Sequence, residues 1–228
     1  ELRVPFDVRA ALTRLAAGAG LGVVGNVSVL SPPWTMPMRT QLAGRLHNSD
    51  DGIGLDDMRL GANATYRNGD TDLAFTYGLA GPMRVREGTL HVAPLGLVVY
   101  GAVPSLQGTG ALTFGDSLSM QLDGTLSSWP RAWPVLPSPL GESTSPLPFT
   151  LDYRGRGDLS ATTALRLRRD TTRFDGTFRL PSVLQWIDHL DTASPLPPLS
   201  GHLTSPKIDI AGATLEGVEV EFGEDATP

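Results

Sequence analysis

The chain of 228 residues is long enough to bury a substantial hydrophobic core, and it carries a formal net charge of −6 with no cysteine. The negative charge argues against nucleic acid as a partner, and the lack of cysteine excludes disulfide bonds, thiol catalysis and cysteine-based zinc sites. Its 26 glycines and 19 prolines are interspersed with alternating apolar residues, which indicates many short strands joined by turns.

The N-terminal segment combines two periodicities. Residues 2–8 alternate between apolar and polar, which predicts a strand at a sheet edge because Pro5 lies within it. Residues 8–17 place Val8, Leu12 and Leu15 on one helical face, so we expect a short helix there that ends at Gly18. The chain opens directly on a strand pattern, and glycines interrupt the apolar residues 15–30, so we expect a membrane anchor or signal to lie outside this sequence.

The middle of the chain predicts a meander of antiparallel strands. Alternating segments fall at residues 23–30, 36–46, 58–66, 73–79, 83–92, 95–103, 108–114 and 117–126. Asn68 and Gly69 supply the strongest short-range hairpin signal, between the third and fourth of these segments. Strands joined by such short connections pair mostly with their neighbours in sequence.

A proline-rich segment at residues 129–148 interrupts this rhythm and cannot form a central strand. It is either a linker or an ordered loop, and its two tryptophans favour a loop that covers an open end of the sheet. That loop would contribute Trp129, Trp133, Val135 and Leu136. We therefore predict an N-terminal β-meander at 1–128, a loop or linker at 129–148 and a C-terminal β region at 149–228, with one continuous β domain over 1–222 as the alternative.

The C-terminal part repeats the strand pattern and contains one change of period. Strands are predicted at 149–153, 158–168 and 172–180. At Pro181 the period changes from two to 3.6 residues, which predicts a helix at about 181–190. The apolar face of this helix consists of Val183, Leu184, Ile187 and Leu190. Two strands at 202–211 and 214–222 close the chain.

Residue patterns that would indicate catalysis do not occur. The histidines His47, His91, His189 and His202 are scattered, without the spacing of a zinc site. The acidic residues near position 50 do not fit a calcium-binding loop, and no nucleophile elbow or phosphate-binding loop is present. We predict a protein that is not an enzyme and that uses no cofactor or metal.

The strands themselves carry the functional prediction. Each offers one apolar face, and the chain has few helices that could cover those faces. We predict an all-β fold built on a curved antiparallel meander sheet, either a groove or a partly open barrel or sandwich, with one or two short helices at about 8–17 and 181–190. A groove would expose its apolar inner face to a ligand, whereas a filled sandwich or barrel would not. The sequence pattern alone slightly favours a filled sandwich or barrel over an open groove.

The C-terminal segment LSGHLTSPKIDIAGATLEGVEVEF at 199–222 resembles segments of the AsmA-like family of bacterial envelope proteins, related to the TamB and YdbH group. The preceding unit FDGTFRLPSVLQWIDHLD is similar in style, so the resemblance covers about residues 150–222. It implies a periplasmic β region in a Gram-negative bacterium, anchored to the inner membrane, that transports lipid or supports outer-membrane biogenesis. The family offers no catalytic residues to carry over. This chain departs from the pattern by lacking the anchor and by its proline-rich interruption.

On this basis we predict a non-catalytic domain whose apolar groove shields the acyl chains of a phospholipid or a similar ligand. The candidate lipid-binding residues are Phe75, Tyr77, Leu112, Phe114, Leu165, Leu167, Phe174, Phe178, Leu184, Trp186 and Ile187. One alternative is a protein-interaction module of an envelope or secretion machine, with an envelope protein as its partner. Another is a carbohydrate-binding β-sandwich that uses Trp34, Trp129 or Trp133.

Overall fold

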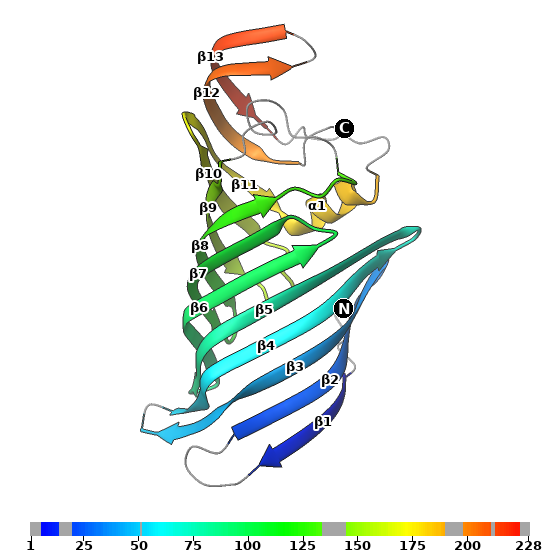
Figure 1. The fold of residues 1–228 in the computed structure, drawn as a ribbon, viewed down its shortest axis with the longest axis vertical. Coiled ribbons are helices and arrows are strands. Elements are labelled where there is room, and N and C mark those ends of the chain that lie inside the picture. The colour runs from blue at the N-terminus through cyan, green and yellow to red at the C-terminus, as the bar shows by residue number, and fades with distance from the viewer. Residues whose placement is uncertain are drawn as a thin grey trace.

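The computed structural model describes residues 6–13, 20–50, 52–133, 145–189, 198–210 and 213–223. These residues form one antiparallel sheet of thirteen strands, in which the spatial order of the strands is their order along the chain (Figure 1). The strands are β1 (Phe6–Thr13), β2 (Gly20–Ser31), β3 (Trp34–Ser49), β4 (Gly52–Asn68), β5 (Thr71–Arg86), β6 (Thr89–Gly101), β7 (Ser105–Phe114), β8 (Leu118–Ser128), β9 (Leu147–Gly155), β10 (Thr162–Arg169), β11 (Thr172–Arg179), β12 (Ser200–Ile210) and β13 (Ala213–Phe222), with the helix α1 (Leu180–Ile187) between β11 and β12. The predicted all-β curved meander is confirmed.

Turn chemistry fixes the register of the hairpins. Asn68 pairs with Thr71 at the β4–β5 turn, and Gly69 between them has a φ of +54°, which glycine adopts without steric cost. The predicted Asn-Gly hairpin is therefore confirmed, and it sets which residues of β4 and β5 face each other.

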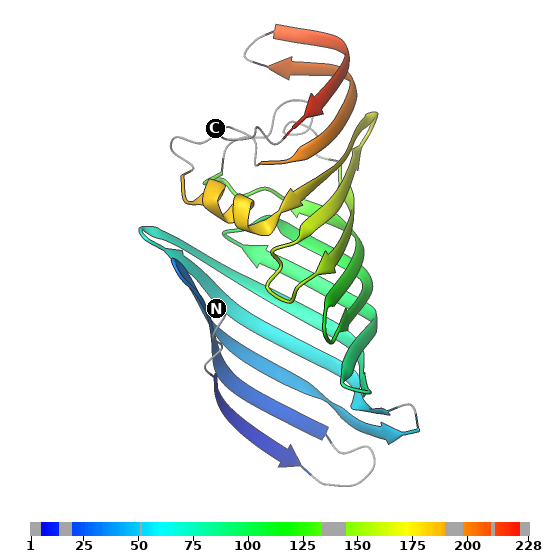
Figure 2. The same cartoon turned by 180° about the vertical axis from the view of Figure 1, so that it is seen from behind.

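The sheet coils around its long axis instead of lying flat (Figures 1 and 2). Register shifts occur in five successive strand pairings, from β3–β4 to β7–β8. Such bulges bend the strand that carries them and increase the local twist. At Gly81, with a φ of +145°, a Cβ atom would collide with the Pro94 carbonyl group of the neighbouring strand, so this bend requires glycine. The line of bulges accounts for the curvature between β3 and β7.

The helix predicted at 8–17 is wrong. Residues Phe6–Thr13 form strand β1, which pairs with β2 so that Ala10 lies opposite Val23. The apolar residues of this segment also alternate with period two, so the same residues fit both a helix and a strand. All eight residues of β1 are in register with β2, so the backbone groups that face β2 are satisfied along the whole strand, which favours the strand over the helix. Residues 14–17 of the predicted helix lie outside the described residues.

The helix predicted at 181–190 is present as α1, over Leu180–Ile187, with Pro181 in its first turn. Leu190 lies outside the described residues. Among the described residues, no helix is both long and apolar enough to cross a membrane.

Buried side chains gather on the inside of the coil. The largest cluster joins Leu55, Met58, Val92, Leu95, Leu122 and Phe149, and a second one joins Phe174 and Leu203. A third cluster contains Trp133, Trp186 and Ile187. The core is therefore a lining of the inner face together with a separate cluster around α1.

Candidate functional site

A single row of residues crosses the inner face from β2 to β13. Each member lies directly opposite the next in the strand register. This apolar row consists of Val23, Leu42, Leu60, Leu79, Leu97, Gly108, Gly124, Phe149, Leu167, Phe174, Leu203 and Val220. Eleven steps between neighbouring strands, at about 4.8 Å each, make the row about 50 Å long along the sheet.

The two glycines of the row leave space for the ring of Phe149. A Cβ atom at Gly124 would lie 2.6 Å from Cζ of Phe149, and one at Gly108 would lie 3.5 Å from the same atom. The ring therefore lies over both glycines and continues the apolar surface where the backbone would otherwise be exposed. Gly176 accommodates the ring of Phe174 in the same way, because a Cβ atom at Gly176 would lie 2.5 Å from Cζ of Phe174.

Charge is segregated between the two faces of the sheet. In the described part of strands β2 to β9, the positions on the face of the apolar row carry no Asp, Glu, Lys, Arg or His. In these strands the charged residues occupy the outer face, and the outer face also carries the ion pair between Arg166 and Asp175 at 3.1 Å in β10 and β11, whereas Arg169 of β10 lies on the inner face. An ionised group on the inner face would lose hydration without a partner, so this face suits uncharged, apolar matter.

The centre of the inner face is not fully covered. Leu60, Leu79 and Leu97 pack against the largest cluster but remain partly exposed to solvent. In a filled β-sandwich, side chains at the centre of the inner face are buried against a second sheet. The apolar row therefore offers a surface to which an apolar ligand can add contacts.

One end of the inner face carries exposed apolar side chains. Ile53, Val85, Leu90 and Phe114 follow one another in register across β4, β5, β6 and β7, and we call them the open lip. Ile53 is 63% exposed, Val85 39% and Phe114 47%. A Cβ atom at Gly157 would lie 2.9 Å from the Phe114 ring, so this ring extends over the backbone at Gly157. The lip extends the apolar inner face to the molecular surface.

The opposite ends of the same strands are covered by a tryptophan cluster, defined as Trp129, Trp133 and Trp186. Trp133 makes edge-to-face contacts with both others, at centroid distances of 5.1 Å to Trp129 and 5.5 Å to Trp186. Leu73 and Val103 pack against this cluster. Of the residues predicted to form a loop over a sheet end, Trp129 and Trp133 make these contacts, whereas Val135 and Leu136 lie outside the described residues.

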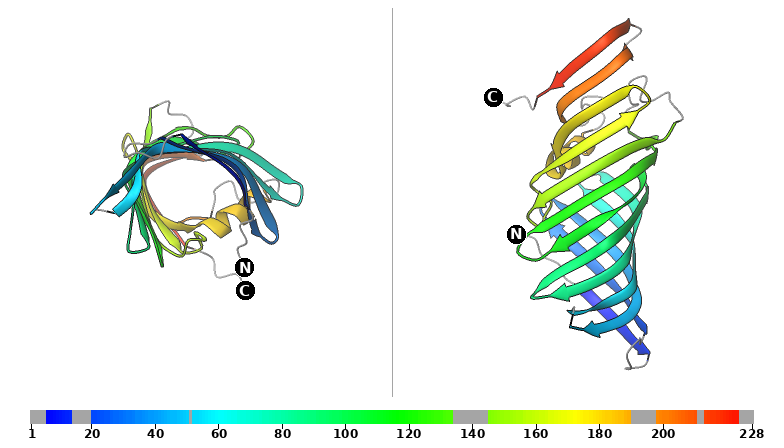
Figure 3. Two further views of the ribbon diagram at one scale, coloured as in Figure 1. Left: turned by 90° about the horizontal axis from the view of Figure 1, so that it is seen from below. Right: turned by 90° about the vertical axis from the view of Figure 1, so that its left-hand side faces the viewer.

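A polar contact joins the end of α1 to β4. The Tyr66 hydroxyl donates a hydrogen bond to Asp188 Oδ2 at 3.1 Å, and Asn68 Nδ2 donates to the same oxygen. Burial, together with the nearby negative charge of Asp188, raises the pKa of Tyr66 to about 12. Figure 3, viewed from below on the left, shows α1 lying between the N-terminal and C-terminal parts of the coiled sheet.

The candidate residues from the sequence fall into two groups. Those from strands lie on the inner face: Phe75, Tyr77, Leu112, Phe114, Leu165, Leu167, Phe174 and Phe178. Those from the helix pack in or against the tryptophan cluster: Leu184, Trp186 and Ile187. Sequence reasoning did not select Leu60, Leu97 and Phe149, although the same alternation places them inward. The register that puts them into one row is visible only in the structure.

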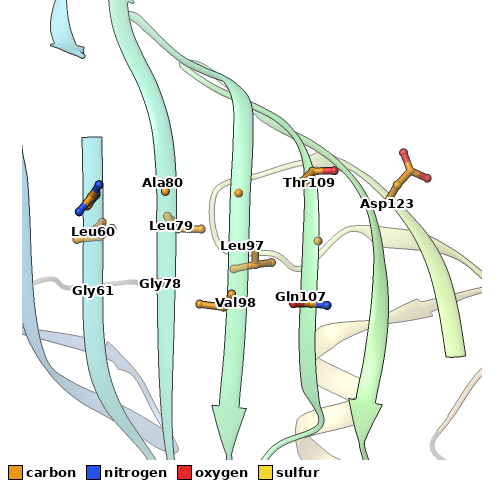
Figure 4. Close-up of a pocket in the computed structure, with 13 residues that line it drawn as sticks. Leu60, Gly61, Gly78, Leu79, Ala80, Leu97, Val98, Gln107, Thr109 and Asp123 are labelled. Carbon is orange, nitrogen blue, oxygen red and sulfur yellow. The ribbon is translucent and has the colours of Figure 1, made fainter. Parts of the chain in front are cut away.

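A hollow of about 640 Å³ lies over strands β4 to β8 (Figure 4). Its side-chain walls come from the outer face, with Arg59 at one side and Asp123 at the other, and Gly61, Gly78 and Gly96 contribute to its floor. Asp123 accepts a hydrogen bond from Thr150 at 2.8 Å. The residues lining the hollow include no serine, cysteine or histidine that could act as a nucleophile or base.

Polar clusters elsewhere are ion pairs of the outer face. Asp56 accepts a hydrogen bond from Arg84 and contacts His47, and these partners lower the pKa of its carboxyl group, the Arg84 hydrogen bond most strongly. No group of three or more His, Asp or Glu residues that could hold a metal ion occurs in the part of the chain that the structure describes.

Comparison with protein-family models, with characterised proteins and with solved structures gave no match. The resemblance to AsmA-like envelope proteins therefore stays a prediction, and the function has to be argued from the inner face itself.

Proposed function

We propose that this chain is a lipid-handling domain of the bacterial envelope, whose curved sheet shields acyl chains on its inner face. The observation that carries the proposal is the apolar row, which is continuous from β2 to β13 and is partly exposed at its centre. The absence of charge along the inward positions of β2 to β9 favours the hydrocarbon part of a ligand over a polar one.

The dimensions suit acyl chains placed end to end. The hydrocarbon core of a bilayer is about 30 Å thick, so one acyl chain spans about 15 Å of it. A row of about 50 Å is about three times that length. Each methylene group that leaves water for the apolar face contributes about 0.8 kcal/mol, so a chain can move along the row while most of its hydrocarbon stays shielded.

The open lip is the proposed site of lipid uptake. Its exposed side chains let hydrocarbon pass from outside onto the inner face without crossing charged surface. We propose the lip because the other ends of these strands are covered by the tryptophan cluster and α1.

Binding of a fluorescent phospholipid to the delipidated protein tests the proposal, with a matched pair of variants. Leu97 points inward, and the adjacent Val98 points outward and is 46% exposed. We expect Leu97→Arg to weaken binding at least tenfold and Val98→Arg to leave it unchanged, with circular dichroism confirming that both remain folded. The milder Leu97→Gln serves if the arginine variant does not fold. Equal affinity of the inward and outward variants would refute the proposal, and so would a lack of lipid binding by every form of the protein, including one in which α1 is released.

The structure also bears on the two alternatives. Strands β1 and β13 are the edges of the described sheet, which supports docking of an envelope protein by strand addition at either edge. Recovery of one stoichiometric protein without lipid from envelope extract would favour this reading. A carbohydrate site has less support, because Trp133 is only 8% exposed and Trp34 packs against Tyr66 at a centroid distance of 5.8 Å.

The proposed location in the periplasm rests on the family resemblance. Fractionation of cells that express the protein tests it, since recovery with the soluble cytoplasmic fraction would contradict an envelope role.

A further inference from the structure

Helix α1 links two parts of the sheet that are far apart along the chain. It follows β11 directly, yet Trp186 and Ile187 belong to a cluster that includes Leu73 at the start of β5 and Val103 after β6. Leu73 is an inward-facing residue, opposite Tyr66 in the register of β4 and β5. The helix and the tryptophan cluster thus occupy apolar surface at one end of the inner face.

The helix is held in place by a small polar contact, which we call the Asp188 latch: Asp188 with Tyr66 and Asn68. One carboxylate oxygen accepts both hydrogen bonds, from residues 122 and 120 positions away in sequence. Hydrogen bonds to a carboxylate are stronger than those between neutral groups, so the latch stabilises the position that α1 has in this structure.

Two buried polar atoms, one in the latch and one in the tryptophan cluster, lack a partner among the described residues. Asp188 Oδ1 and Trp133 Nε1 are both inaccessible to solvent, and in the described part of the chain neither has a hydrogen-bond partner. Buried polar groups in folded proteins are nearly always paired, and each unpaired one disfavours the state that contains it. Movement of the helix into water would satisfy both atoms.

The helix has little stability of its own. It has only eight residues, its N-terminus lacks a side-chain cap, and no acidic residue lies in its first turn. Helices this short are stable only through the packing of their apolar face. An acyl chain that covered Leu73 and Val103 in place of α1 would remove the packing that keeps the helix in position.

We propose that α1 and the tryptophan cluster form an autoinhibitory plug, which occupies one end of the apolar inner face and is displaced by acyl chains. This inference rests on the proposed lipid-handling function and adds its regulation. Plug and lipid compete for the same apolar surface. The apparent lipid affinity is therefore the intrinsic affinity reduced by the fraction of molecules in which the plug is open.

The absence of cysteine from the chain allows a direct test. In the Asn68→Cys/Asp188→Cys variant, a short thiol-specific cross-linker fixes the helix to β4, and the same variant without cross-linker has lost the latch. We expect the cross-linked form to bind fluorescent phospholipid at least tenfold more weakly than the uncross-linked form. The Tyr66→Phe/Asn68→Ala variant, which removes both donors, should bind about tenfold more tightly than the unsubstituted protein.

Tryptophan fluorescence gives a readout that does not depend on lipid. In a Trp34→Phe background, only the three tryptophans of the cluster remain, and release of the latch should shift their emission to longer wavelength. If the unsubstituted protein binds lipid and cross-linking changes neither affinity nor emission, the plug is refuted while lipid handling stands. If no form binds lipid, both proposals fail. Binding by the latch-free form alone would support both.

Discussion

The contact between Phe149 and Gly124 predicts a large effect from a single methyl group. Gly124→Ala adds a Cβ atom 2.3 Å from the Gln107 carbonyl oxygen and 2.6 Å from Cζ of Phe149, separations that van der Waals contact does not allow. Phe149 is 7% exposed and belongs to the largest buried cluster, so its ring has little room to move. Overpacking of this kind destabilises a protein by about 1–3 kcal/mol, and we expect Gly124→Ala to reduce the free energy of unfolding by about 2 kcal/mol.

The assay is urea denaturation followed by circular dichroism, with Gly61→Ala as the matched control. A Cβ atom at Gly61 meets no atom within 4 Å, so this outward substitution should stabilise the strand by about 0.5 kcal/mol, because alanine loses less backbone entropy on folding. Phe149→Leu combined with Gly124→Ala should recover only part of the loss, since the Gln107 carbonyl group also approaches this position. A Gly124→Ala protein as stable as the unsubstituted one would show that the ring does not lie over Gly124.

Three further predictions concern the two ends of the inner face. Trp186→Ala removes a ring that is 7% exposed, and we expect the free energy of unfolding to fall by about 3 kcal/mol. The near-ultraviolet circular dichroism of the tryptophan cluster should be lost as well. A fall below about 1 kcal/mol would mean that α1 does not pack against the tryptophan cluster. The pKa of Tyr66 is raised from 10.0 to about 12, so the stabilisation that this shift provides is complete below pH 10 and is lost as the pH rises toward 12. The urea midpoint of the unsubstituted protein should therefore fall more steeply with pH across this range than that of Tyr66→Phe. Identical pH dependence of the two midpoints would contradict the raised pKa. Phe114→Ser changes a side chain that is 47% exposed, so stability should stay within about 0.5 kcal/mol while lipid uptake slows; unchanged uptake kinetics would exclude the open lip as the uptake site.

Local pattern was sufficient to predict the meander. The alternation in residues 58–66 and 73–79, with Asn68 and Gly69 between them, predicts a hairpin because its turn chemistry and strand period agree. The change of period at Pro181 likewise predicts α1, since proline suits the first turn of a helix. Both signals lie within a few residues of one another, so they do not depend on the rest of the fold.

Features that depend on pairing partners could not be predicted. Residues 8–13 fit a helix and a strand equally well, and only the presence of β2 alongside decides between them. The apolar row requires the register of every hairpin, including the shifts at the bulges, which no single strand reveals. The hydrogen bond from Tyr66 to Asp188 joins residues 122 positions apart, and nothing in either neighbourhood predicts the other.

The neighbour-only pairing of the strands has a consequence for how such a surface changes in size. Because the chain never returns to an earlier strand, inserting or deleting one hairpin leaves every other pairing in register. A hairpin also preserves the alternation of inward and outward positions, since it adds one strand in each direction. The length of the apolar inner face is thus set in increments of two strands, about 10 Å for each added hairpin, and can be altered without redesigning the remaining sheet.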